Sequence, residues 1–310
     1  MSAPSDRDVL STRTIPRSYY EKLFKETDNL RKELETKNIL DSCRGSILAT
    51  IFMEPSTRTR LSFHYAMVKI GGEVIDFGPV EAASIAKGET FEDTMRMIDG
   101  YAPDVIVIRT KVPGSAKLAA GICAAPVING GDGSNEHPTQ AMLDLYTMQK
   151  LRGTIDGAKI GLMGDLAHSR TTSSLSYALD KFDNVSIFYI APLELQVRPE
   201  VVDSLSHVHV EKTETYVNVI RDLDFLYVTR LQRERFTEPR EYERLKGSYQ
   251  LDRPSLSKYS KLPFIMHPLP RVDELNPDLD ALSIAKYFEQ ARNGMYVRAA
   301  LLKRTISGQS

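Results

Sequence analysis

The stretch SILATIFMEPSTRTR, residues 46–60, places an apolar run directly before a polar segment that carries the signals of a helix start. Residues 46–53 have the length and composition of a buried strand. Pro55 then restricts the chain and Ser56 supplies a capping residue, which predicts a helix that begins at the tetrapeptide Ser56–Thr59. A buried strand followed at once by a helix is the repeating unit of α/β folds.

The same unit recurs along the chain. Short apolar runs predict further strands at residues 104–108, 126–128, 159–163, 185–190, 225–228 and 263–266. Between them, apolar residues at helical spacing predict helix faces made of Leu61, Tyr65 and Val68, widened by Phe63, Met67 and Ile70, and of Ala141, Leu145 and Met148. This alternation predicts an α/β protein with two doubly wound, parallel-sheet domains.

The boundary between the domains is predicted near Arg152 and Gly153, where a long helical stretch ends and a new series of strands begins. We expect the first domain to comprise residues 1–140 together with 292–310, and the second to comprise residues 141–291. This division requires the helix predicted at residues 293–306 to return to the first domain.

The composition describes a globular protein with no overall charge bias. Lys and Arg number 40 against 41 Asp and Glu among 310 residues, so no net charge attracts the chain to nucleic acid or to a membrane. Cys43 and Cys123 lack the spacing of a disulfide framework or a zinc site, the first residues lack a signal peptide, and no apolar run could span a bilayer. We therefore expect a cytosolic protein. No cluster has metal-ligand spacing, and the nucleotide-binding and hydrolase motifs are absent from the sequence.

Polar residues follow the predicted strands at their carboxyl ends, where ligands bind in α/β sheets. Arginine occurs after five of these strands, beside hydroxyl, amide and imidazole groups, at Arg58, Arg109, Arg170, Arg230 and Arg271. The segment Ser56–Thr59 combines hydroxyl groups, an arginine and the unpaired N–H groups of a helix start, which suit a phosphate. A capped helix with solvated arginines is the alternative explanation.

The other polar positions also permit two interpretations. His137 is either a structural histidine or a hydrogen-bond donor to a polarised carbonyl. Arg170, Arg230 and Gln232 could clamp carboxylates, and the alternative for the two arginines is that they form surface salt bridges. The loop HPLP, residues 267–270, is either a rigid turn or a source of free backbone carbonyls.

Taken together, these residues resemble the catalytic chains of the aspartate carbamoyltransferase family over nearly the whole sequence. The resemblance is carried by FMEPSTRTRLSF (52–63), SIAKGET (84–90), Ile108-Arg109, NGGDGSNEHPTQ (129–140), Gly164-Asp165 with Arg170-Thr171, TRLQRER (229–235), HPLPRVDE (267–274) and Val297-Arg298. It implies transfer of the carbamoyl group of carbamoyl phosphate to the amino group of L-aspartate, an early step of pyrimidine biosynthesis. It implies neither a metal nor an organic cofactor.

The resemblance also implies a role for each site residue. The first domain would bind carbamoyl phosphate, through Ser56, Thr57, Arg58, Thr59, Arg109, His137 and Gln140, and the backbone carbonyls of Leu269 and Pro270 would hold its amide. The second would bind aspartate through Arg170, Arg230 and Gln232. Thr59, Arg109 and His137 would stabilise charge on the carbonyl oxygen. Family members are trimers with shared active sites, so Ser84 and Lys87 would enter the site of the neighbouring chain, where Lys87 also acts in catalysis and on aspartate.

Two departures and three alternatives accompany this resemblance. Ala167 stands where many relatives have lysine, and Thr110-Lys111 replaces a frequent His-Pro near the docking place of regulatory chains, so regulatory-chain binding stays undecided. A transcarbamoylase for ornithine is the nearest alternative, but Pro268 and the Thr-Arg-x-Gln pattern around Arg230 favour aspartate. A silent structural partner and an anion-binding regulatory module are the remaining alternatives.

Overall fold

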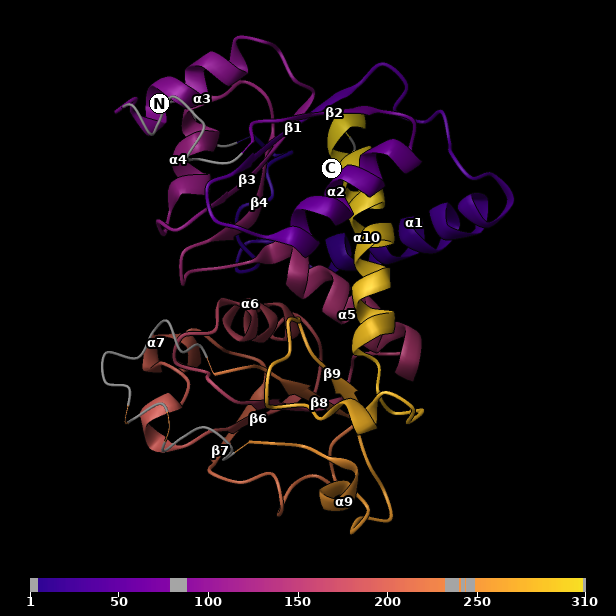
Figure 1. Cartoon of the computed structure of the whole chain (residues 1–310), viewed down its shortest axis with the longest axis vertical. Helices are drawn as coiled ribbons and strands as arrows, with labels where there is room; N and C mark the ends of the chain where they lie inside the picture. Colours follow the sequence, from indigo (N-terminus) through magenta and orange to yellow (C-terminus); the bar gives the residue numbers. More distant parts are fainter. Residues whose placement is uncertain (1–4, 79–87, 232–239, 241–242, 244–248, 309–310) are drawn as a thin grey trace. The chain divides into compact units, whose positions relative to one another are not determined.

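The computed structural model describes residues 5–78, 88–231, 240, 243 and 249–308. The chain forms two compact units (Figure 1): unit 1 comprises Met1–Met142 and Asn293–Ser310, and unit 2 comprises Leu143–Arg292. Among the described residues, each unit contains one sheet, and all strand pairs of both sheets are parallel. The predicted α/β class with two parallel sheets is therefore confirmed.

The sheet of unit 1 has four strands in the order β2-β1-β3-β4. These are β1 (Ile47–Phe52), β2 (Glu73–Asp76), β3 (Val105–Thr110) and β4 (Val127–Asp132). The strands β3 and β4 extend further than their apolar runs, so Arg109 and Asn129 lie within strands and not beyond them. The edge strand β2 was absent from the sequence-based prediction because its residues alternate between exposed and half-buried positions.

Helices cover both faces of this sheet. Helices α3 (Phe91–Asp99) and α4 (Ser115–Ile122) pack in one apolar core with Ile51 of β1 and Ile106 of β3. On the opposite face lies α2 (Thr57–Lys69), where His64 Nε2 is 2.9 Å from Thr50 Oγ1. Thr50 precedes Ile51, and adjacent strand residues point to opposite faces of a sheet.

The buried face of α2 differs from the prediction. Phe63, Met67 and Ile70 are fully buried, as expected. Leu61 and Tyr65 were wrongly expected to share this core face, because they are 48% and 63% exposed. Val68, also 48% exposed, completes the same exposed stripe. The helix thus has two apolar sides, and only one of them packs inside its own unit.

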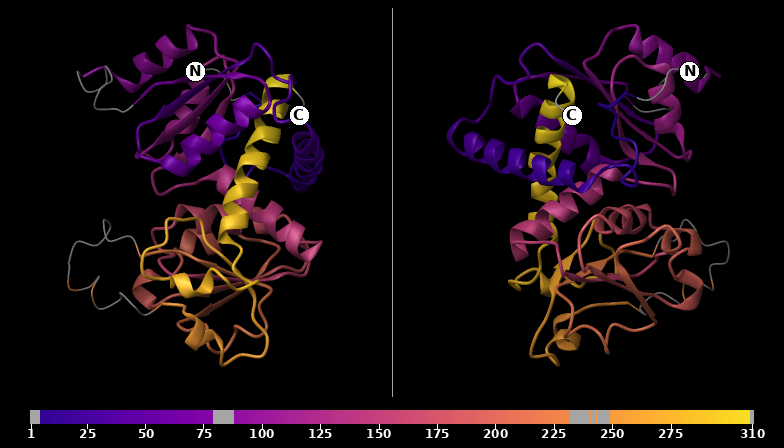
Figure 2. Two further views of the ribbon diagram at one scale, coloured as in Figure 1. Left: turned by 45° about the vertical axis from the view of Figure 1, so that its right-hand side comes forward. Right: turned by 180° about the vertical axis from the view of Figure 1, so that it is seen from behind.

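Most of α10 (Tyr287–Ser307), from Asn293 onward, belongs to unit 1, which confirms the predicted return of this helix. Arg298 Nη1 donates a hydrogen bond of 2.8 Å to Ser62 Oγ of α2. Arg304 Nη1 lies 2.6 Å from Glu26 Oε1 of α1 (Arg17–Thr36). The two views of Figure 2 show this part of α10 beside α1 and α2.

The sheet of unit 2 has five strands in the order β7-β6-β5-β8-β9. These are β5 (Lys159–Met163), β6 (Ser186–Ile190), β7 (His209–Thr213), β8 (Phe225–Val228) and β9 (Phe264–Met266). The described helices are α5 (Pro138–Arg152), which begins in unit 1, α6 (Arg170–Leu179), α7 (Pro199–Val202) and α9 (Arg253–Leu256), with short 3-10 turns at Leu193–Leu195 and Pro277–Leu279.

The two faces of this second sheet are again covered separately. Ile190 and Val228 pack with Leu256 of α9 in one apolar core. On the other face, Tyr189 Oη donates a hydrogen bond of 2.8 Å to Ser176 Oγ of α6. Within the described residues, no helix has both the length and the apolar character needed to cross a membrane.

Candidate functional site

The strands β1, β3 and β4 are neighbours in the sheet of unit 1, so the polar segments at their carboxyl ends share one edge. Ser56 occupies the N-cap position of α2 with extended backbone angles, and its side chain makes no capping hydrogen bond. The residues from Thr57 to Thr59 form the first turn, whose N–H groups have no acceptor inside a helix. This turn presents backbone donors, hydroxyl groups and the positive end of the helix dipole at a single point, which favours an anion.

Thr59 and His137 meet at this edge. Thr59 Oγ1 lies 3.3 Å from His137 Nε2, and both residues are buried. On the other side of the ring, Thr139 Oγ1 lies 3.5 Å from Nδ1. Gln140 is also buried, in the first turn of α5, and its N–H group donates to the carbonyl of His137. The contact between Thr59 and His137 joins residues that stand 78 positions apart in the sequence.

Arg109 is held by two partners at the end of β3. Its Nη1 donates to the carbonyl oxygen of Gly130 at 3.2 Å, and its Nη2 lies 3.1 Å from Glu54 Oε1. The side chain of Arg109 is only 10% exposed. A guanidinium that is already oriented loses less side-chain entropy when an anion binds to it.

The ends of β5 and β8 touch in unit 2. The N–H group and Oγ1 of Thr229 both donate to the carbonyl of Met163, at 2.8 and 3.1 Å. A Cβ atom on Gly164 would lie 2.1 Å from the carbonyl oxygen of Thr229, and Gly164 has a φ of +117°. Only glycine permits both this backbone angle and this approach. Arg230 directly follows Thr229, so its backbone lies next to Gly164, where the loop that leads to Arg170 starts.

Arg170 is the first residue of α6. Ser169 caps this helix by accepting a hydrogen bond from the N–H group of Thr172 at 3.3 Å. The loop before it is fixed by Asp165, whose Oδ1 lies 2.9 Å from His168 Nδ1. The start of α6 is thus ordered by hydrogen bonds on both sides of Arg170.

The HPLP loop follows β9, which pairs with β8 at the same edge of the sheet. Leu269 adopts a φ of +56°, a conformation that branched side chains rarely adopt, and the peptide bond between Leu269 and Pro270 is cis. Buried His267 lies at the base of the loop, where its Nε2 is 2.7 Å from Glu274 Oε1 and its Nδ1 is 2.8 Å from the Leu269 nitrogen.

Some of the expected site residues cannot be placed. Ser84, Lys87 and Gln232 lie outside the described residues. Sequence reasoning also missed two carboxylates, Glu54 beside Arg109 and Glu274 beside His267, although both stand inside the quoted motifs. In the described part of the chain, no group of three or more His, Cys, Asp or Glu residues is arranged to hold a metal ion.

Comparison with protein families matches both halves of the chain. The model described as the carbamoyl-P binding domain of aspartate/ornithine carbamoyltransferase matches residues 7–150, and the model for the Asp/Orn binding domain matches residues 156–305. The aspartate carbamoyltransferase catalytic subunit of Methanopyrus kandleri is 47% identical over 99% of this chain and 100% of its own length. The corresponding subunit of Thermofilum pendens is 48% identical over 97% of this chain and 96% of its own length.

Solved structures agree with these matches. The catalytic subunit of the M. jannaschii aspartate transcarbamoylase superposes with a TM-score of 0.90 at 44% identity, covering 98% of this chain and 99% of that chain. The Trypanosoma cruzi enzyme in complex with carbamoyl phosphate and aspartate superposes with a TM-score of 0.89 at 34% identity, covering 96% and 94%. With both domain models matched in order and full-length relatives near half identity, this chain belongs to the aspartate/ornithine carbamoyltransferase family.

Proposed function

We propose that this chain transfers the carbamoyl group of carbamoyl phosphate to the amino group of L-aspartate, giving N-carbamoyl-L-aspartate and phosphate. The observation that carries the choice of aspartate is the contact between the ends of β5 and β8. There, Gly164 and Thr229 approach each other closely, and Arg170 and Arg230 follow the two strands. Two guanidinium groups suit an amino acid with two carboxylates, because each can bind one carboxylate with paired hydrogen bonds.

In unit 1, we assign carbamoyl phosphate to the edge of the sheet where α2 begins. Ser56, Thr57 and Arg58 supply donors to the phosphate oxygens, and Gln140 contributes to the carbamoyl end. Thr59, Arg109 and His137 bind the carbonyl oxygen. Two observations support this assignment. Thr59 and His137 are 3.3 Å apart, and Arg109 lies on β3, between the strands β1 and β4 that lead to these two residues.

The chemistry follows from these positions. The neutral amine of aspartate attacks the carbamoyl carbon, a C–N bond forms, and the C–O bond to phosphate breaks through a tetrahedral intermediate. Negative charge grows on the carbonyl oxygen, where the donors of Thr59, Arg109 and His137 are already oriented. The leaving phosphate takes up the proton that the amine releases. Binding two anions next to each other, against their repulsion in water, supplies a further part of the rate enhancement.

The remaining contacts in the proposal come from unit 2. Arg170, Arg230 and Gln232 bind the carboxylates of aspartate, and the carbonyls of Leu269 and Pro270 accept hydrogen bonds from the carbamoyl amide. The unusual backbone angle of Leu269 supports this role, since such conformations concentrate at functional sites. In functional terms, residues 1–140 with 292–310 bind carbamoyl phosphate, and residues 141–291 bind aspartate.

We further propose that the active protein is a cytosolic homotrimer in which Ser84 and Lys87 complete the site of a neighbouring chain. The support is the exposed stripe of α2, formed by Leu61, Tyr65 and Val68, together with Ile75 of β2, which is 59% exposed. Apolar patches of this kind mark contact surfaces between proteins. Regulatory chains are not part of the proposal.

Carbamoyl transfer by the purified chain tests the proposal. Aspartate and ornithine are supplied in turn with carbamoyl phosphate, and the carbamoylated amine and released phosphate are both measured. We expect product with aspartate, and preferred use of ornithine would reject the proposal. Arg170→Ala should lower kcat/KM for aspartate by about 10- to 100-fold, which corresponds to loss of charge-assisted hydrogen bonds. The matched control is Arg253→Ala, because Arg253 is an exposed arginine of α9 in the same unit.

A further inference from the structure

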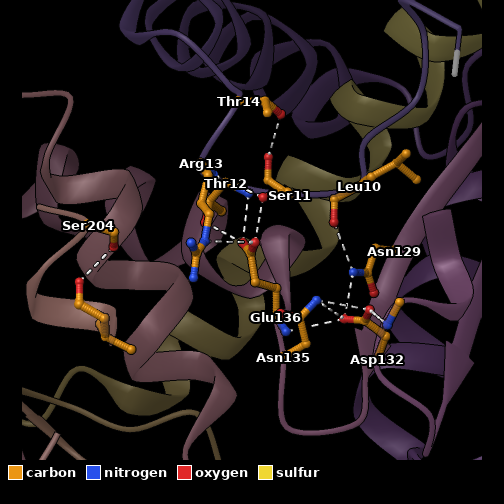
Figure 3. Close-up of polar contacts among 12 residues, drawn as sticks. Leu10, Ser11, Thr12, Arg13, Thr14, Asn129, Asp132, Asn135, Glu136 and Ser204 are labelled. Atoms are coloured by element: carbon orange, nitrogen blue, oxygen red, sulfur yellow. Dashed lines mark hydrogen bonds and ion pairs between the residues drawn. The ribbon is translucent and has the colours of Figure 1, made fainter. Parts of the chain in front are cut away.

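Glu136 is a buried carboxylate directly before His137. It is 2% exposed, at the turn between β4 and α5. Its Oε2 accepts hydrogen bonds from the N–H group of Thr12 at 2.8 Å and from Thr12 Oγ1 at 2.6 Å. Its Oε1 accepts a hydrogen bond from Ser11 Oγ, and Arg13 Nε approaches the same oxygen at 4.0 Å. Figure 3 shows Ser11, Thr12 and Arg13 gathered around this one carboxylate.

The donors to Glu136 belong to residues 8–12, here called the N-terminal strap, which is fixed along the edge of β4. The N–H group of Val9 donates to the carbonyl of Val127, and the N–H group of Asn129 donates to the carbonyl of Val9, both at 2.9 Å. The side chain of Asn129 also donates to the carbonyl of Leu10 at 3.0 Å. The strap thus extends the sheet by one short parallel bridge, and Ser11 and Thr12 leave it in a defined direction.

The backbone of Glu136 is fixed as well. Its N–H group donates to Asp132 Oδ1, and its carbonyl accepts from the N–H group of Asp132, both at 3.2 Å. Asp132 is itself held, since its Oδ2 accepts from the N–H group of Gly114 at 2.8 Å and from Asn135 Nδ2 at 3.1 Å. Side chain and main chain of Glu136 are therefore both anchored, and the next residue along the chain is His137.

We propose that Glu136 is a positioning residue, through which the N-terminal strap holds His137 at the distance from Thr59 that the reaction requires. This inference rests on the proposed function, in which His137 binds the carbonyl oxygen. A carboxylate is a costly group to bury, and an apolar side chain could fill the same place with less desolvation. The carboxylate is held in one position by three hydrogen bonds, from Ser11 Oγ and from the N–H group and hydroxyl of Thr12. An apolar side chain would make no directional contact, and the turn before His137 could then shift.

Substitutions in the strap separate positioning from folding. Thr12→Val keeps the shape and the N–H donor but removes the hydroxyl, whereas Thr12→Ser restores it. Thr14→Val is the matched control, because Thr14 is exposed two residues after Thr12, just beyond the strap, and its hydroxyl donates to the carbonyl of Ser11, not to Glu136. We expect Thr12→Val and Glu136→Gln to lower kcat by about 10- to 100-fold, as displacement of a catalytic group by about 1 Å does. The KM for aspartate should stay within about twofold of its value in the unaltered chain, since aspartate is bound by other residues.

The position of His137 can be followed without turnover. The chain has six histidines, so NMR spectra of isotopically labelled imidazole rings can be assigned, with His137→Asn identifying the signal of His137. We expect this signal to move in Thr12→Val and to return in Thr12→Ser, and to be unchanged in Thr14→Val. A kcat for Thr12→Val equal to that of Thr14→Val, or no recovery with Thr12→Ser, would overturn the inference.

The two proposals fail in different ways. If the unaltered chain forms no carbamoyl aspartate, the proposed function is rejected, and the NMR comparison still decides the positioning role. An unmoved His137 signal in Thr12→Val then rejects that role as well. If carbamoyl aspartate forms at an unaltered rate in Thr12→Val, the proposed function stands and Glu136 is only a buried structural carboxylate.

Discussion

His267 Nε2 lies 2.7 Å from Glu274 Oε1, and both side chains are buried. His267 Nδ1 accepts a hydrogen bond from the N–H group of Leu269, so the proton of a neutral ring is on Nε2, where it points at the carboxylate. The backbone N–H group of His267 donates to Gln290 Oε1 at 2.8 Å. One histidine thus connects Glu274 and α10 to the loop that carries Leu269.

The two ring nitrogens of His267 should have separable roles. In His267→Asn, the amide oxygen can accept from Leu269 but cannot reach Glu274, whereas His267→Gln reaches Glu274 and leaves the N–H group of Leu269 without this acceptor. We expect His267→Asn to keep most of its turnover and to lose about 1–3 kcal/mol of unfolding free energy. We expect His267→Gln to lose about tenfold in kcat, since Leu269 is displaced. Steady-state rates and denaturant unfolding measure the two effects, and a reversed order would contradict this assignment.

Stability should fall in acid through Glu274. Burial opposes ionisation of this carboxyl group, but the hydrogen bond from His267 and those from the backbone N–H groups of Glu274 and Val272 outweigh it, so the pKa of Glu274 lies below its usual value. A lowered pKa in the folded state adds stability above the unfolded-state pKa of about 4.3. That contribution disappears as the pH falls through the folded-state pKa. The unfolding free energies of the unaltered chain and of Glu274→Gln should therefore begin to approach each other below about pH 4.3 and continue to do so as the pH falls through the folded-state pKa, and a constant difference would argue against the linkage.

Gly164 should tolerate no side chain. An added Cβ would lie 2.1 Å from the carbonyl oxygen of Thr229, and the φ of +117° adds strain. We expect Gly164→Ala to cost about 4 kcal/mol or more of unfolding free energy. Gly153→Ala is the control, because Gly153 also has a positive φ of +87° but has nothing within 4 Å of the added atom. It should cost only about 1–2 kcal/mol. Equal losses in the two variants would show that the close approach contributes little.

The exposed stripe of α2 should mediate self-association. Tyr65→Glu places a charge on a side chain that is 63% exposed, so the folded chain should tolerate it. Desolvating that charge in an interface is unfavourable, and the oligomer should dissociate at micromolar concentration. Light scattering measures the mass, and circular dichroism checks the fold. Leu193→Glu is the control, because Leu193 is 78% exposed in unit 2. An unchanged mass for Tyr65→Glu would exclude this face as the interface.

The sequence predicted the central strands and the edge strands β4 and β9, but it missed the edge strands β2 and β7. In a parallel sheet the inner strands are covered on both faces, so β3 and β5 appear as continuous apolar runs. The edge strands β2 and β7 have exposed positions and carry charged residues, and neither was predicted. The sequence also could not show which face of α2 is buried, because Leu61, Tyr65 and Val68 have the same spacing as residues of a core face.

The site was predictable as a set of residue types but not as a set of contacts. Motif residues such as Thr59 and His137 were identified in the sequence, and the structure brings these two within hydrogen-bonding distance. The carboxylates that contact the motif residues, such as Glu54 beside Arg109, were not identified. A contact between residues that are far apart in the sequence leaves no local pattern. Thr12 and Glu136 stand 124 positions apart, and only the pairing of the N-terminal strap with β4 brings them together.

The return of residues 293–307 to unit 1 has a consequence for biosynthesis. Domains generally fold in the order in which they leave the ribosome. Here all of unit 2 is synthesised before the segment that places Arg298 beside Ser62 and Arg304 beside Glu26. Unit 2 therefore leaves the ribosome before unit 1 is complete, because unit 1 lacks residues 293–307 until they are released.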